Sequence, residues 1–182
     1  MNKVNTTLND CFVLDPIVHG DDRGFFIESW NAKTFSSMGL DVQFVQDNHS
    51  RSTKNVLRGL HYQVNHPQGK LVRVTRGTVF DAVVDLRRSS STFGKWFGVE
   101  LSEANKQMLW VPPGFAHGFL VLSEFADFQY KCTQYYSPKD DRSLRWDDQT
   151  VGIQWPLDPG ETPGLSDKDA VATSFSDAET FR

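Results

Sequence analysis

A short stretch of the chain, RGLHYQ at residues 58–63, places ionisable side chains in a sequence typical of a β-strand. Such groups are costly inside a sheet protein unless they are paired or functional. Arg58, His61 and Gln63 lie here, and Lys70 follows directly after the turn NHPQG. An imidazole can act as a general base near neutral pH, and a fixed ammonium can stabilise a developing oxyanion. The cluster therefore predicts proton-transfer chemistry, although His61 or Lys70 alone would more often be a satisfied or solvated side chain.

Strand alternation puts further polar side chains on otherwise apolar faces. The expected same-face sets are His61 with Gln63, Lys70 with Val72 and Val74, His117 with Phe119 and Val121, and Tyr130 with Phe128 and Cys132. These sets predict a polar patch at one end of an apolar interior, where a phenol such as that of Tyr130 could donate a proton. In a regular strand, Arg58 and His61 would point to opposite faces of the sheet. To share a site with His61, Arg58 must therefore precede the strand or follow a bulge near Gly59.

The elements that must hold these residues are short apolar and aromatic runs separated by turn signals. We expect about ten strands, and one short helix in NAKTFSSMGL that begins at Asn31 and ends at Gly39. HGDDRG is predicted as a turn between the strands FVLDPI and GFFIESW. Strands at this spacing favour an all-β sandwich or barrel, specifically a jelly roll, with a few short helices. The length suits one domain over residues 1–182.

Composition excludes several classes of function. A net charge of −4 argues against broad nucleic-acid binding. No apolar run reaches membrane-spanning length, and the N-terminal residues have no apolar segment typical of a signal peptide. Cys11 and Cys132 have neither metal-site nor disulfide-framework spacing, so we expect buried free thiols. A soluble cytoplasmic protein is the resulting expectation.

Two polar stretches could bind a ligand. In GDDRGFF, residues 20–26, Arg23 could capture an anion while Phe26 stacks on it, unless the stretch is only a solvated turn. In FVQDNHS, residues 44–50, Gln46 and Asn48 could hydrogen-bond a base or a sugar.

The stretch VPPGFAH, residues 111–117, contains a P-x-G-x-x-H pattern that ends at His117. It resembles the second motif of the cupins, β-barrels that often bind a metal. The first cupin motif would have H-x-H and then Glu, whereas this chain has His61-Tyr62-Gln63 and then Lys70. A cation in that place opposes a divalent ion, so we expect a cupin fold without a metal.

Taken together, many segments in one order resemble the dTDP-4-dehydrorhamnose 3,5-epimerase family. The segments are GDDRGFFIES, FVQDNHS, NVLRGLHYQ, QGKLVRV, VFDAVVDLR, WVPPGFAHGF, FQYKCTQYYSP, IQWP and LSDKD. The resemblance implies a cofactor-independent isomerase that converts dTDP-4-dehydro-6-deoxy-D-glucose into dTDP-4-dehydro-L-rhamnose. It also implies a homodimer with strand exchange across the interface.

The resemblance further implies a role for each matched residue. His61 would be the base, paired with Asp169 of LSDKD, while Lys70 steadies the enolate and Tyr130 is the acid on the other face. The implied substrate contacts are Arg23 and Arg58 on the diphosphate, His117 near the sugar, and Phe26, Glu28, Gln46, Asn48 and Tyr135 on the nucleotide, some across the dimer. Asp141 stands where a glutamate is expected, which leaves its part in substrate binding open.

Three alternatives remain at this point. The same residues would serve an epimerase acting only at C3 or only at C5. A metal-dependent cupin oxygenase and a non-catalytic sugar-nucleotide binding module are the others. A module that only binds would not need the base and acid that His61 and Tyr130 supply on opposed strands.

Overall fold

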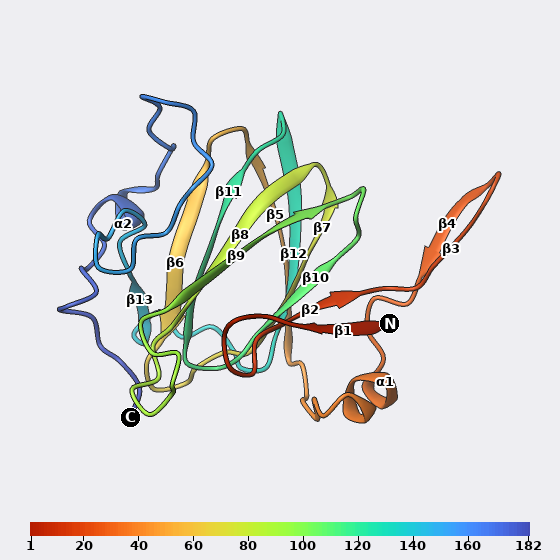
Figure 1. Ribbon diagram of the computed structural model, residues 1–182, viewed down its shortest axis with the longest axis horizontal. Helices are drawn as coiled ribbons and strands as arrows, with labels where there is room; N and C mark the ends of the chain where they lie inside the picture. The colour runs from red at the N-terminus through yellow and green to blue at the C-terminus, as the bar shows by residue number, and fades with distance from the viewer.

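The computed structural model describes residues 1–182, and its regular elements are almost all antiparallel strands (Figure 1). The larger of its two main sheets has six strands in the order β1-β2-β10-β7-β12-β5. These strands are β1 (Asn2–Asn5), β2 (Phe12–Asp15), β5 (Gln46–Thr53), β7 (Lys70–Arg76), β10 (Met108–Val111) and β12 (Phe125–Cys132).

The second main sheet has five strands in the order β13-β6-β11-β8-β9. Its strands are β6 (Leu57–Gln63), β8 (Thr78–Asp85), β9 (Trp96–Ser102), β11 (Phe115–Val121) and β13 (Asp141–Ser143). The prediction of an all-β sandwich is confirmed. Thirteen strands form rather than about ten, because β1, β13 and β3 (Val18–Asp21) are too short or too polar to stand out as apolar runs.

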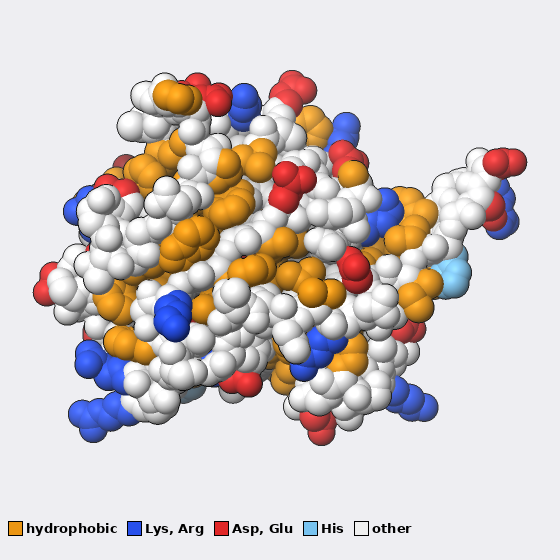
Figure 2. All heavy atoms as spheres, in the orientation of Figure 1, with side chains coloured by type: hydrophobic (Ala, Val, Ile, Leu, Met, Phe, Trp, Pro, Cys, Tyr) orange, Lys and Arg blue, Asp and Glu red, His pale blue; other side chains and the backbone are white.

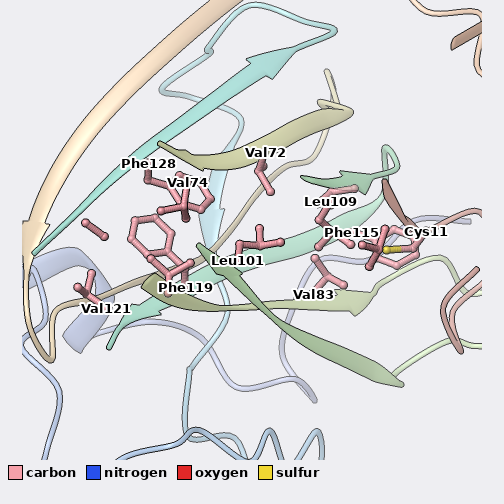
Figure 3. Packing of buried hydrophobic residues seen from close by; sticks show 14 of the residues in the cluster. Cys11, Val72, Val74, Val83, Leu101, Leu109, Phe115, Phe119, Val121 and Phe128 are labelled. Carbon is pink, nitrogen blue, oxygen red and sulfur yellow. The ribbon is translucent and has the colours of Figure 1, made fainter. Parts of the chain in front are cut away.

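The interior lies between the two sheets and contains a cluster of 15 buried apolar residues (Figure 3). Val72 and Val74 of β7 face it from one sheet, and Val83 and Phe119 face it from the other. The rings of Phe119 and Phe128 stack across the interior with centroids 4.1 Å apart. Burying a side chain of this size contributes roughly 1.5–3 kcal/mol, so the cluster fixes the spacing of the sheets. Strand alternation therefore predicted correctly which faces point inward.

A two-stranded arm extends from the body of the protein. It consists of β3 (Val18–Asp21) and β4 (Gly24–Ile27). It stands clear of both sheets in Figure 1 and projects from the body of the protein in Figure 2. Phe26 is 68% exposed there. The prediction of HGDDRG as a turn is wrong in part, because only Asp22 and Arg23 lie between the paired Asp21 and Gly24.

The chain after β13 packs against the five-stranded sheet and brings helix α2 (Asp167–Ala170) beside β6 (Figure 1). Trp155 contacts Phe80 of β8 and Phe181 contacts Tyr62 of β6, each with edge-to-face rings. The Leu57 amide also donates to the Gly164 carbonyl at 3.0 Å. These contacts hold the polar residues of α2 at the edge of the sandwich.

Other local predictions are confirmed. Helix α1 (Ala32–Ser37) begins after Asn31, whose side-chain oxygen accepts hydrogen bonds from the amides of Lys33 and Thr34. The helix ends before Gly39, which has a φ of +83°. Cys11 and Cys132 are both buried and unpaired. None of the helices has the length and apolar character needed to span a membrane.

Candidate active site

A pocket of about 270 Å³ opens at one end of the sandwich, where polar side chains replace the apolar ones of the interior. Both main sheets contribute to its walls. Its lining residues include Ser50, Arg58, His61, Gln63, Gln68, Lys70, His117, Phe119, Phe128, Tyr130, Tyr136, Asp141 and Lys168. The polar patch that strand alternation predicted therefore exists.

His61 of β6 is paired with the buried Asp169 of α2. The imidazole Nε2 lies 2.6 Å from the carboxylate Oδ1, and the Ser166 hydroxyl donates to Oδ2 at 2.9 Å. Burial by itself raises the pKa of Asp169, but hydrogen bonds from His61 and Ser166 outweigh it and leave the pKa below its ordinary value. An ionised Asp169 accepts a hydrogen bond from a protonated Nε2 of His61. The free lone pair of the imidazole is then on Nδ1.

Lys70 begins β7 on the opposite sheet and is 8% exposed. Its ammonium makes one long contact within the chain, to the His61 carbonyl oxygen at 3.5 Å, so its other N–H bonds can face the pocket. Burial lowers the pKa of Lys70, an effect that Cys132 and Asp141 only partly offset.

Tyr130 of β12 lies beside Lys70 on the same sheet and lines the same pocket. Burial raises the pKa of its phenol above the ordinary value, so the hydroxyl keeps its proton at neutral pH. Tyr130 pairs with Val72 of β7 and with Asn48 of β5, and its ring lies 6.1 Å from that of Phe128. The phenol is thus held as a proton-bearing group facing the five-stranded sheet.

Arg58 reaches the pocket because β6 contains a bulge, which was one of the two arrangements expected from the sequence. His61 pairs with His117 while Arg58 pairs with Phe119, so the register shifts between them. Gly59 at this shift has a φ of +109°, and a Cβ there would lie 2.6 Å from the His117 carbonyl oxygen. Only glycine fits this approach. The Arg58 guanidinium donates to the Ser52 hydroxyl at 2.9 Å and keeps donors free toward the pocket.

A second buried pair joins His117 of β11 to Asp81 of β8. The His117 Nε2 lies 2.9 and 3.0 Å from the two carboxylate oxygens. Burial raises the pKa of Asp81, and the nearby His117 and Lys70 only partly counter this. Sequence reasoning missed Asp81, although its position on the same strand face as Val79 and Val83 was a readable signal.

The mouth of the pocket contains three interacting polar groups. The Lys168 ammonium contacts the Asp141 carboxylate, and the Tyr136 hydroxyl donates to the same carboxylate oxygen at 3.0 Å. Asp141 is thereby tied to α2, the helix that bears Asp169. Lys168 and Tyr136 were not among the predicted site residues.

Several residues expected at the site do not line this pocket within one chain. Arg23 and Phe26 are on the exposed arm, where Arg23 forms an ion pair with Asp21. Glu28 accepts hydrogen bonds from Asn31 and Thr34 at the start of α1.

The remaining expected nucleotide contacts lie close to the pocket without lining it. The Tyr135 side chain is 68% exposed, and it is the neighbouring Tyr136 that lines the pocket. Gln46 and Asn48 are on the edge strand β5, hydrogen-bonded to each other at 3.0 Å.

The described side chains include no group of three or more His, Cys, Asp or Glu residues arranged to hold a metal ion. His61 and His117, the two histidines of the cupin-like motifs, each have one nitrogen engaged by a carboxylate. The side chains that could donate to a metal ion thus form no recognisable ligand group.

The chain is similar to known proteins of one family over nearly its whole length. The family model described as dTDP-4-dehydrorhamnose 3,5-epimerase matches residues 5–177. A dTDP-4-dehydrorhamnose 3,5-epimerase from Shigella flexneri is 53% identical over 183 residues, which cover 100% of this chain and 99% of that protein. The enzyme of the same name from Pseudomonas aeruginosa is 52% identical, with coverage of 100% and 99%.

Solved structures give the same result. The dTDP-6-deoxy-D-glucose-3,5-epimerase RmlC of Legionella pneumophila, solved with dTDP-4-keto-L-rhamnose, is similar with a TM-score of 0.94. It is 51% identical, and the match covers 98% of this chain and 94% of that one. ChmJ, a 3'-monoepimerase from Streptomyces bikiniensis solved with dTDP-quinovose, is 31% identical with a TM-score of 0.88, over 95% of this chain and 87% of that one. Because full-length relatives and the family model agree, the chain, with its cupin-like fold, belongs to the dTDP-4-dehydrorhamnose 3,5-epimerase family.

Proposed function

We propose that this chain is an isomerase that converts dTDP-4-dehydro-6-deoxy-D-glucose into dTDP-4-dehydro-L-rhamnose and requires no cofactor. One observation carries the proposal. His61 and His117 lie on the five-stranded wall of the pocket, while Lys70 and Tyr130 lie on the six-stranded wall opposite them. A base and an acid on opposite sides of a bound sugar are what inversion at a carbon requires.

The reaction begins with His61 as the base. The C4 ketone of the substrate acidifies the hydrogens at C3 and C5, and the unprotonated Nδ1 of His61 removes one of them. Asp169 holds the proton on Nε2 through the 2.6 Å contact and stabilises the imidazolium that forms. The Asp169 carboxylate is therefore a positioning group for the base.

Lys70 supports the enolate that results. The residue is only 8% exposed, and its ammonium can direct N–H donors into the pocket, where a charge on the C4 oxygen is stabilised more strongly than in bulk solvent. Tyr130 then returns a proton from the other face, which inverts the carbon. Water at the pocket mouth reprotonates the phenolate before the next cycle.

The nucleotide part of the substrate needs more than this pocket. Arg58 lies at the edge of the pocket as a ligand for the diphosphate, and Gln46 and Asn48 on β5 lie next to it along the sheet edge. We include Asp141 and Lys168 among the groups at the sugar, since both line the pocket mouth. A pocket of about 270 Å³ is at the low end of the range for small-molecule sites, which supports contributions from elsewhere.

We propose that those contributions come from a second copy of the chain. In a homodimer with strand exchange, the exposed arm would bring Arg23 and Phe26, and with them Glu28, to the partner's pocket. Tyr135, which is exposed beside the mouth, would complete the nucleotide contacts. We further propose that residues 1–182 act as one epimerase domain and that the enzyme is cytoplasmic, which suits its two unpaired cysteines.

The experiment is proton NMR of dTDP-4-dehydro-6-deoxy-D-glucose with the purified, chelator-treated protein in D₂O. We expect deuterium at both C3 and C5 and an L-rhamno product that a reductase can trap. Exchange at only one carbon would reassign the protein to the single-position epimerases, of which ChmJ is one example. No exchange at either carbon would refute the proposed reaction.

His61→Ala serves as the control variant in that experiment, because it removes the proposed base by shortening one half-buried side chain of β6. We expect it to abolish deuterium incorporation at both carbons, with an unchanged circular dichroism spectrum. Near-normal turnover by His61→Ala would refute the assignment of the base.

A further inference from the structure

The second histidine–carboxylate pair has no part in the reaction described so far. His117 lies directly opposite His61 in the register of β11 and β6. Its partner Asp81 is completely buried and does not line the pocket. Asp81 therefore makes no direct contact with a bound substrate: it acts through its hydrogen bond to His117, and its charge also acts on the nearby Lys70.

Asp81 has a single side-chain partner. It lies on β8 among apolar residues that face the interior, and both of its carboxylate oxygens are directed at the His117 Nε2. A buried carboxylate is costly unless it is paired and hydrogen-bonded. The pairing fixes the orientation of the His117 ring, which also lies nearly parallel to the ring of Phe128, with centroids 6.0 Å apart.

The other nitrogen of His117 is open to the pocket. Nδ1 has no hydrogen-bond partner in the chain, and the only fully buried polar side-chain atom left unpaired is the Ser143 hydroxyl. Nδ1 is therefore accessible from the pocket that His117 lines. In a neutral imidazole one nitrogen donates and the other accepts, so a carboxylate that holds the proton on Nε2 leaves an acceptor at Nδ1.

We propose that Asp81 is a positioning residue that, through the fixed tautomer of His117, presents a hydrogen-bond acceptor to a hydroxyl group of the sugar ring. The inference rests on the proposed function, because the hydroxyl belongs to that substrate. Lys70 and Tyr130 offer donors from the opposite wall, so an acceptor at His117 complements them. A hydroxyl bound there keeps the sugar ring in place while His61 on the neighbouring strand removes the proton.

The first test requires no substrate. Long-range proton–nitrogen NMR of the ¹⁵N-labelled full-length protein reports which nitrogen of each imidazole is protonated. We expect His117 to be protonated on Nε2 and unprotonated on Nδ1, and Asp81→Asn to shift that signature toward the other tautomer. The matched variant Asp169→Asn should change the His61 signals and leave those of His117 unaltered. A proton on Nδ1 of His117 in the wild-type protein would overturn the inference, and this result does not depend on whether Asp81→Asn folds.

The second test measures turnover by Asp81→Asn. We expect kcat/KM to fall roughly tenfold to 150-fold, the range that corresponds to the loss of a hydrogen bond to a charged group. A folded Asp81→Asn protein with kcat/KM within about twofold of wild type would overturn the inference. Failure of the wild-type protein to turn over the sugar would instead refute the proposed function, and the tautomer of His117 would still be measured independently.

Discussion

Replacing Asp169 with asparagine tests whether the carboxylate behind His61 is needed for proton abstraction. The change keeps the size of the side chain and the Ser166 contact, but it removes the charge that faces Nε2 at 2.6 Å. The amide can also turn its NH₂ group toward the imidazole. Nε2 then becomes the acceptor, the ring proton moves to Nδ1, and the base is blocked.

The size of the effect follows from the geometry. The Asp169 side chain is 2% exposed, so water does not screen its contact with His61. A hydrogen bond to a charged group contributes about 1.5–3 kcal/mol, which corresponds to a decrease in kcat of roughly tenfold to 150-fold. KM should change little, because Asp169 does not line the pocket.

The assay is initial-rate kinetics coupled to a reductase, with Asp167→Asn as the control. Asp167 precedes Lys168 on the same helix, is exposed, and makes no hydrogen bond through its side chain, so its loss should leave kcat within about twofold of wild type. Unchanged kcat in Asp169→Asn, with a folded protein, would refute the role of the carboxylate.

The same variant makes a prediction about stability. The pKa of Asp169 is lower in the folded protein than in an unfolded chain, so the ionised group stabilises the fold at pH values above 3.8. That contribution disappears as the pH falls through the lowered folded value. The difference in Tm between wild type and Asp169→Asn should therefore be greatest near neutral pH and shrink under acid conditions, and a difference that grows with acid would contradict the assignment.

Three further predictions concern other parts of the site and the core. Tyr130→Phe should still exchange substrate protons with D₂O but should yield little inverted product, and normal epimerisation measured by NMR would remove Tyr130 from the acid role. Burial lowers the pKa of Lys70 below 10.5, the ordinary value for lysine, so the charged form proposed to stabilise the enolate should be lost below that pH. As it is lost, kcat should fall, and a pH–rate profile that stays level up to pH 10.5 would contradict this. Leu101→Ala, at a completely buried core position away from the pocket, should lower the free energy of unfolding by about 2–5 kcal/mol in denaturant titrations while sparing activity per folded molecule; a smaller loss would mean that the core closes around the gap.

The strands and their inward faces could be predicted because two-residue alternation is a local property. Lys70, Val72 and Val74 point to one side of β7 as expected, and Lys70 is consequently buried. The bulge at Gly59 was one of two arrangements expected for a similar reason, since Arg58 and His61 could share a pocket only if Arg58 preceded the strand or a bulge lay between them. Asp81 obeys the same rule, so its omission was an error of reasoning and not a limit of the sequence.

Other parts could not be obtained from local patterns. The contact between His61 and Asp169 joins positions 108 residues apart, and it depends on how an irregular segment packs against a finished sheet. No spacing rule predicts that packing, so only the family resemblance suggested the pair. Arg23 and Phe26 are a different case, because the packing of a single chain leaves the arm without a partner. The binding role proposed for them requires a second molecule, which no intrachain pattern describes.

The location of α2 has a consequence for how the enzyme is made. Both sheets except β13 are complete in sequence by Cys132, but the carboxylate that orients His61 is supplied by residue 169. During synthesis the pocket walls can therefore form before the base is oriented. Contacts between distant segments also form slowly, because the intervening chain must be ordered first. A chain interrupted before α2 would have most of its sandwich and still be a poor catalyst. A measurement of enzymatic activity therefore shows whether synthesis has passed this helix, whereas a measurement of β-strand content does not.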